Sequence, residues 1–264
     1  MAAPILPVST VPTSLESPWR GRIRLGDHVA VFVGVPGDAA PHAHHAHQIV
    51  ISEHDGCGLT VEGAIRLGRA WIVPSGTPHR VCAGTGPTTF IYVEPWVYNL
   101  ESFPPVEGIA PRNADDWLPW LEAEWPARPL PPTLDALLAD IDRSLGDPIR
   151  VGELAKRQNI STSQLERRLG ASVGLPVRQL VIWRRLRYAV DRVLAGASLT
   201  AAALDAGFSD AAHFSRSLRA TFGVRADRSL IPVARGSQSE TSRESHVGVV
   251  GASDAAVDRK GSIS

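Results

Sequence analysis

The chain contains 264 residues with a mass of 28.3 kDa, a length that suits two domains. Its composition, 44% hydrophobic and 20% charged, is typical of a globular protein and excludes wholesale disorder. No stretch approaches about 18 consecutive apolar residues, which excludes a hydrophobic membrane-spanning helix. Two cysteines are too few for a disulfide framework. Residues 1–15 hold no basic residue and no long apolar run, so we expect no secretory signal and a cytoplasmic protein.

The net charge of the whole chain is zero, but the two signs are unevenly distributed. Residues 1–132 hold 8 basic and 13 acidic residues, a net charge of −5. Residues 133–235 hold 16 basic and 10 acidic residues, a net charge of +6, and nearly all of these cations are arginines. This asymmetry indicates a polyanionic partner for the second half only, although a solvated helical surface without a partner would carry the same charge.

Proline, glycine and serine divide the chain into five parts. Residues 1–18 are rich in Pro, Ser and Thr and are predicted to form a flexible arm. Residues 19–125 are predicted to form a β-rich domain that ends in helices, and the proline-rich residues 126–132 an extended linker. Residues 133–235 have helical periodicity, whereas residues 236–264 lack it and are predicted to be disordered.

Short runs of β-forming residues, separated by Gly, Pro and Asp, fill most of the first domain. Their regular spacing is typical of a sandwich or a small barrel. After them, Trp117, Trp120 and Trp125 recur at spacings of three to five and predict a helix within 112–125. These tryptophans either pack in the core or form a surface for dimerisation. The predicted strands are 29–33, 48–51, 59–61, 71–73 and 89–93.

The helical half begins with an amphipathic helix and then repeats one design twice. Leu134, Leu137, Leu138 and Ile141 recur at helical spacing, with Thr133 as the expected N-cap. Segments 151–170 and 198–218 each predict a short helix, a tight turn and a second helix.

Both segments have the residues that a helix-turn-helix unit requires. Ala155 and Ala203 are small where the two helices of a unit must approach closely, and Gly207 suits the turn. Each second helix has an apolar face and exposes polar residues near its N-terminus. A recognition helix presents side chains to base edges in this way.

Residues 133–230 resemble the DNA-binding domain of the AraC/XylS family of bacterial transcription regulators. Residues 203–216 match the family pattern A-x-x-x-G-F-x-D-x-x-H/Y-F-S-R, and residues 185–189 match its R-L-x-x-A. The resemblance implies an all-α domain of seven helices, in which a long central helix joins two helix-turn-helix units that enter adjacent major grooves of promoter DNA. It also implies a homodimer, with RNA polymerase as a further partner.

The resemblance and the exposed positions together predict the DNA contacts. Arginine can bond guanine in a bidentate manner, alanine methyl groups can contact thymine, and other arginines bind phosphates. We expect Arg168 and Arg219 at phosphates, and His213 as a packing residue in preference to a base reader. The full predicted set is Thr162, Ser163, Gln164, Glu166, Arg167, Arg168, Ala211, Ala212, Ser215, Arg216 and Arg219.

The β-rich half carries a histidine constellation. His42, His44 and Gln48 follow the first cupin motif, H-x-H-x3,4-E, with Gln in place of Glu. Residues 68–79 match the second cupin motif, G-x5-P-x-G-x2-H, and end at His79. Residues 19–98 therefore resemble the cupin-type sensing domain at the N-terminus of many AraC-family regulators, which implies a cupin-like barrel. His28, His45, His47 and His54 are expected at the surface or along an effector pocket.

Three interpretations of the histidine cluster stay open. Three imidazoles with a weak fourth ligand suit a divalent transition metal, with Zn, Ni or Cu favoured over Mg or Ca. Alternatively, His42, His44, Gln48 and His79 bind an organic effector without a metal, or they form a structural cluster. The resulting hypothesis is a non-enzymatic, DNA-binding regulator that responds to a small molecule or a metal. The alternative is a metal-dependent cupin enzyme with a helical accessory domain.

Overall fold

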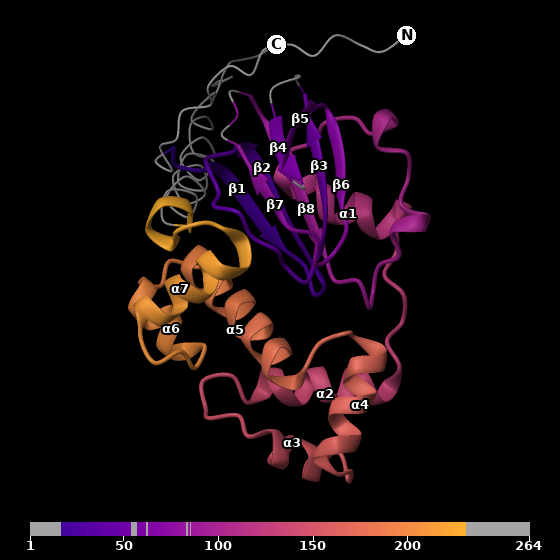
Figure 1. Ribbon diagram of the computed structural model, residues 1–264, viewed down its shortest axis with the longest axis vertical. Coiled ribbons are helices and arrows are strands. Elements are labelled where there is room, and N and C mark those ends of the chain that lie inside the picture. The colour runs from indigo at the N-terminus through magenta and orange to yellow at the C-terminus, as the bar shows by residue number, and fades with distance from the viewer. Residues whose placement is uncertain (1–16, 54–56, 62, 83, 85, 231–264) are drawn as a thin grey trace, which may run out of the picture.

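The computed structural model describes residues 17–53, 57–61, 63–82, 84 and 86–230 (Figure 1). Most of the predicted arm, the whole of the predicted tail 236–264 and His54 lie outside these residues. The described chain forms an N-terminal β-rich domain followed by a C-terminal helical domain. None of the described helices combines the length and apolar character that a membrane crossing requires.

Antiparallel strands form two sheets in the N-terminal domain. The larger sheet has the order β1-β2-β8-β3-β6 and the smaller one the order β5-β4-β7. All five predicted strands are present, and three more were not predicted: β1, β5 and β7. The bounds are β1 Arg20–Leu25, β2 Val29–Val35, β3 His47–Ser52, β4 Cys57–Val61, β5 Ala64–Gly68, β6 Ala70–Val73, β7 His79–Val81 and β8 Thr88–Val93.

Alternation along the strands gives the larger sheet two buried faces. Val50 and Phe90 pack on one face against Leu59 of the smaller sheet. Ile49 and Ile91 point to the other face, into a core that contains the helices. The closed barrel that the cupin resemblance implies is not confirmed, because the strands belong to two separate sheets.

Helix α1 (Ala114–Glu124) covers the outer face of the larger sheet. Asn113 caps it by accepting hydrogen bonds from the backbone N–H groups of the first turn. Trp117 and Trp125 are fully or almost fully buried, so the core interpretation is confirmed for these two tryptophans. Trp120 remains partly exposed, and the guanidinium of Arg112 lies 4.4 Å from its ring centroid. Two short 3-10 turns, Leu100–Ser102 and Val106–Gly108, precede the helix.

Within the part of the chain that the structure describes, helices α2 to α7 follow the linker, and their bounds agree with the predicted periodicity. The first begins at Pro132, so the expected N-cap at Thr133 is wrong; the missing N–H of a proline makes it well suited to the first helical position. Residues 226–230 add a final helical turn. The bounds are α2 Pro132–Arg143, α3 Val151–Arg157, α4 Thr162–Ser172, α5 Val177–Leu194, α6 Leu199–Asp205 and α7 Ala211–Phe222.

A buried carboxylate joins the two domains. Glu94 follows β8, is 1% exposed, and accepts a 2.7 Å hydrogen bond from Nε1 of Trp183 on α5. His28 donates from Nδ1 at 2.6 Å, and the guanidinium of Arg184 lies 3.6 Å away. Burial opposes ionisation of Glu94, but the His28 hydrogen bond and the Arg184 charge outweigh it and lower the pKa of the carboxyl group. Glu94 is therefore an ionised anchor for α5.

We predict that Glu94→Gln lowers the free energy of unfolding by about 1–3 kcal/mol, because it leaves buried donors without their carboxylate. The pKa of the Glu94 carboxyl group is lower in the folded state than in the unfolded state. Its contribution to the free energy of unfolding is therefore fully present above the unfolded-state pKa of about 4.3, and it is lost as the pH falls through the folded-state pKa. Urea unfolding at pH 7 and in acid measures both effects.

Glu153→Gln is the matched control, because Glu153 forms an exposed pair with Arg150 at 3.2 Å. Its cost should stay below about 0.5 kcal/mol. Equal costs for the two variants would contradict the anchoring role of Glu94.

Candidate nucleic-acid interface and ligand sites

The first helix-turn-helix unit consists of α3 and α4. Its turn places Asn159 in the left-handed region at φ 54°, and the N–H of Ile160 donates to the carbonyl of Ala155 at 3.0 Å. Ala155 is buried between the helices, as its size predicted. Ser161 and Gln164 form a reciprocal capping box that starts α4. The turn and the cap together set the angle at which α4 leaves the unit.

The second unit, α6 and α7, repeats this geometry. Gly207 has a φ of 80°, and the N–H of Phe208 donates to the carbonyl of Ala203 at 2.9 Å. The positive φ at Gly207 favours glycine, and the guanidinium of Arg185 lies 2.8 Å from the position that a Cβ would occupy. Asp210 caps α7 by accepting from the backbone N–H of His213 at 2.6 Å. The two units therefore share the same turn geometry and are joined by α5.

Most of the predicted DNA-contacting residues lie on accessible faces of α4 and α7. Glu166 is half-buried and accepts a hydrogen bond from the N–H of Val177 at 3.2 Å, so it also supports the start of α5. Gln164 is engaged in the capping box. Ala211 and Ser215 are half-buried. The exposed members are Thr162, Ser163, Gln164, Arg167, Arg168, Ala212, Arg216 and Arg219.

The arginines of the two recognition helices contrast with three arginines elsewhere in the helical domain. Arg143, Arg157 and Arg192 form salt bridges with aspartates. Within the described chain, no salt bridge or hydrogen bond engages the side chains of the four predicted DNA-contacting arginines. Unpaired exposed guanidinium groups on two equivalent helices are suited to phosphates and base edges. These four are Arg167, Arg168, Arg216 and Arg219.

His213 makes its contacts within its own unit. Its ring lies edge-on to Phe208 at 5.2 Å between centroids, and its Nδ1 is 3.2 Å from the hydroxyl of Ser209. These contacts agree with the expected packing role.

The predicted histidines converge in the β-rich domain. The potential ligand atoms of His42, His44 and His79 all lie within 4.8 Å of one another, and all three residues are buried. Gln48 is fully buried beside them. His42 and His44 lie in the segment before β3, where His42 forms an isolated antiparallel bridge with His79, whereas Gln48 lies on β3 and His79 on β7. The cluster therefore connects this segment to both sheets.

Each of the three imidazoles is oriented by a backbone carbonyl. The Nδ1 atoms of His42, His44 and His79 lie 2.8, 2.9 and 2.9 Å from the carbonyl oxygens of residues 40, 46 and 77. Burial, followed by the charge of His79, lowers the pKa of His42 to about 4, and burial lowers that of His44 to about 3. Neutral imidazoles that donate from Nδ1 keep the lone pair on Nε2.

The hydrogen bonds around Gln48 determine how its amide is oriented. The Nε2 atoms of His44 and His79 lie 2.8 and 3.0 Å from the atom assigned as Oε1, while the amide nitrogen of Gln48 has no partner. Nε2 atoms that bear lone pairs cannot donate to an oxygen. The two amide atoms are therefore exchanged, so that the NH2 group donates to both histidines. This assignment gives the Nε2 lone pairs of His44 and His79 a donor, and it leaves the amide oxygen of Gln48 without a partner among the described residues.

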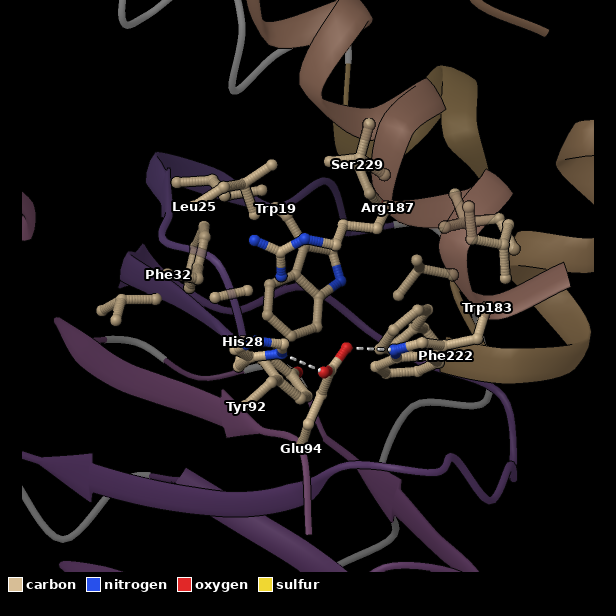
Figure 2. A pocket seen from close by; sticks show the side chains of 17 residues that line it. Trp19, Leu25, His28, Phe32, Tyr92, Glu94, Trp183, Arg187, Phe222 and Ser229 are labelled. Carbon is tan, nitrogen blue, oxygen red and sulfur yellow. Dashed lines mark hydrogen bonds and ion pairs between the residues drawn. The ribbon is translucent and has the colours of Figure 1, made fainter. Parts of the chain in front are cut away.

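A second candidate site is an apolar pocket between the domains. It has a cavity of ≈ 140 Å³, lined by β1, β2 and β8 on one side and by α5 and α7 on the other. Figure 2 shows Arg187 of α5 reaching into this pocket, with Glu94 held between His28 and Trp183. Arg187 makes a 3.4 Å hydrogen bond to the carbonyl of Val29, and burial lowers its pKa.

The sequence analysis missed Glu94, Trp183 and Arg187. No local pattern identifies them, because the pocket forms only when segments about ninety positions apart meet. Among the described histidines that were expected at the surface or along an effector pocket, His28 is the one that lines this pocket.

Comparisons with known proteins agree with this architecture. A family model described as a helix-turn-helix domain matches residues 154–228, which span both units. ToxT of Vibrio cholerae, in an apo structure, is 11% identical with a TM-score of 0.50, and the alignment covers 79% of this chain and 97% of ToxT. The likeness indicates a shared fold. No curated protein matches the chain.

Two further solved structures align less closely. An AraC-type regulator from Chromobacterium violaceum is 23% identical with a TM-score of 0.37, covering 40% of this chain and 94% of that one. Wild-type ToxT bound to an unsaturated fatty acid is 11% identical with a TM-score of 0.46, covering 76% and 94%.

We predict that Arg167→Ala and Arg216→Ala each weaken specific DNA binding by about 1–3 kcal/mol, because each removes a guanidinium from a recognition helix. Titrations of the full chain on the DNA upstream of its own gene, repeated with base-substituted duplexes, measure the loss and its sequence dependence. Specificity should relax at two different positions.

Arg143→Ala removes an exposed, salt-bridged arginine from α2 and serves as the control. If the variants at positions 167 and 216 weaken all duplexes equally, both arginines bind phosphates only.

Proposed function

We propose that the chain is a DNA-binding transcription regulator of the AraC type rather than an enzyme, and that ligand binding to its β-rich domain controls DNA binding; the helix-turn-helix match over residues 154–228 supports this. This proposal is preferred to the alternative of a cupin enzyme with a helical accessory domain, because the helical half matches a helix-turn-helix model across both units. In this proposal the β-rich domain is a cupin-type sensor, and α4 and α7 enter neighbouring major grooves of promoter DNA. A homodimer and a contact with RNA polymerase remain predictions of the resemblance.

The effector that the geometry supports best is a first-row transition metal. The observation that carries this proposal is the set of three buried imidazoles whose Nδ1 atoms each face a backbone carbonyl, which leaves Nε2 as the nitrogen able to bind a metal once the Gln48 amide is displaced. Metal-ligating histidines are usually oriented by such a second hydrogen bond. His42, His44 and His79 would hold the ion, and rotation of the Gln48 amide would present its oxygen as a fourth, neutral ligand. This donor set favours Zn, Ni or Cu over Mg or Ca.

A bound ion would supply a cross-link and no reaction. It would tie the segment before β3 to β3 and β7, and would replace the hydrogen bonds of the Gln48 amide. Its binding energy would therefore act on the relative position of these elements.

We predict that the full chain binds one Zn²⁺ and that His79→Ala weakens binding at least about tenfold, because one of three imidazole ligands is lost. Gln48→Glu should strengthen binding, since a carboxylate adds charge and a better ligand. Zinc titration followed by calorimetry, with metal analysis of the purified protein, measures both effects.

His47→Ala is the matched control, because His47 lies close in sequence but its Nδ1 accepts from the N–H of Ser75 at 3.0 Å. Wild-type protein that binds no zinc, or a loss at position 47 equal to that at position 79, would contradict the metal site.

The interdomain pocket favours a second candidate effector, a small organic anion with an apolar body. The anionic group at the pocket, Glu94, is already paired, whereas Arg187 forms no salt bridge among the described residues. A cavity of about 150 Å³ can hold a benzene-sized molecule. An anion of that size would pair with the guanidinium of Arg187 and would pack against the apolar residues that line the pocket.

We predict that benzoate binds the pocket and that the uncharged benzamide binds more weakly, because only benzoate offers a carboxylate to Arg187. Arg187→Met should weaken benzoate binding about tenfold or more, since a hydrogen bond between charged groups contributes roughly 1.5–3 kcal/mol. Calorimetric titration measures both ligands.

Arg178→Met is the control, because Arg178 lies exposed on the same helix. Equal binding of benzoate by the Arg187→Met variant would show that the arginine does not recognise the anion.

A further inference from the structure

The last residues of α7 lie directly against the histidine cluster. We propose that Phe222 and Gly223 transmit the binding of a metal at this cluster to the DNA-reading helix α7. This inference rests on the metal site proposed above and concerns how that site acts on DNA binding.

Gly223 connects the end of α7 to the segment that carries His42. The backbone N–H of Ala40 donates to the carbonyl of Gly223 at 2.8 Å. Gly223 caps α7 at a φ of 71°, and a Cβ there would lie 2.2 Å from the carbonyl oxygen of Ala40 and 2.6 Å from Nδ1 of His42. Only glycine permits so close an approach between the two domains.

Phe222 adds an aromatic contact beside this hydrogen bond. Its ring centroid lies 5.6 Å from that of His44, with an interplanar angle of 34°. The same ring lies 5.7 Å from Tyr92 of β8 and 5.7 Å from Trp183 of α5. Phe222 therefore touches a candidate metal ligand, the larger sheet and the central helix at once.

Metal binding would require the cluster to contract. The potential ligand atoms are up to 4.8 Å apart, whereas a tetrahedral ion with metal–nitrogen bonds of 2.0–2.1 Å separates its nitrogens by about 3.4 Å. His79 lies on β7, and two backbone hydrogen bonds of 2.9 Å tie His42 to it in an isolated antiparallel bridge, whereas His44 lies outside the strands. Contraction would therefore move His44, which packs on Phe222, and would act on the adjoining segment that is bonded to Gly223.

Helix α7 can carry such a displacement to its other end. Asp210 caps its N-terminus, Gly223 caps its C-terminus, and Phe214 and Leu218 are buried along its length. A packed helix of this length moves as a unit, so a shift at Phe222 also changes the position of Arg216 and Ala212.

Hydrogen exchange of the full chain, with and without saturating zinc, tests this coupling. In the wild type we expect zinc to change the exchange of amides in 214–223 severalfold, as well as those around the cluster. Phe222→Leu removes the ring contact but keeps apolar volume, and Gly223→Ala disrupts the close approach. Both variants should lose the response in α7.

Gly174→Ala is the matched control for Gly223→Ala. Gly174 follows α4 at a φ of 77°, and a Cβ there would meet nothing within 4 Å. The substitution therefore introduces the same backbone strain without the interdomain contact, and this variant should respond to zinc like the wild type.

The outcomes separate this inference from the metal site itself. Zinc that binds the wild type but changes exchange only in the β-rich domain overturns the coupling and leaves the metal site intact. A response in α7 that survives in Phe222→Leu and Gly223→Ala also overturns it. A wild type that binds no zinc overturns both proposals. If the Gly223→Ala variant no longer binds zinc, the test depends on the Phe222→Leu variant: loss of the zinc response in α7 supports the coupling, and a retained response overturns it.

Discussion

The ionised carboxylate of Glu94 is the interaction on which the arrangement of the two domains depends. A charge that is 1% exposed is stable only when its hydrogen bonds and its counter-charge are satisfied. Trp183 and Arg184 supply them from consecutive positions on α5, and His28 supplies one from the residue just before β2. Because both halves of the chain must be present to satisfy Glu94, the position of α5 is tied to that of the larger sheet.

This constraint explains why both candidate ligand sites touch the DNA-binding domain. Once α5 lies against the sheet, the end of α7 is brought to the histidine cluster, and Arg187 is brought to the apolar pocket. Phe222 belongs to both places, since it packs on His44 and also lines the pocket. A ligand at either site would therefore act on the same helix end, without a long chain of intermediate contacts.

The sequence predicted the helix-turn-helix units well because their geometry is encoded locally. A capping serine or aspartate, a buried alanine and a left-handed turn residue lie within about twenty positions of one another. The histidine cluster was also predictable, since two motifs identify its members. By contrast, β1 alternates arginine with Gly, Ile and Leu and holds only two aliphatic residues, and the pairing that makes it a strand comes from β2. Glu94 and Arg187 were missed because their roles arise only from contacts between the halves.

The shared core also affects how this protein can be divided for experiments. One hydrophobic cluster contains Ile49 and Ile91 of the sheet together with Leu180 and Trp183 of α5, although a proline-rich linker separates the two halves in sequence. A fragment truncated at the linker would leave Trp183 and Phe222 facing water, and contiguous apolar patches of this kind promote self-association. Low solubility of such a fragment would therefore reflect the cut through the core and not a weak DNA-binding fold.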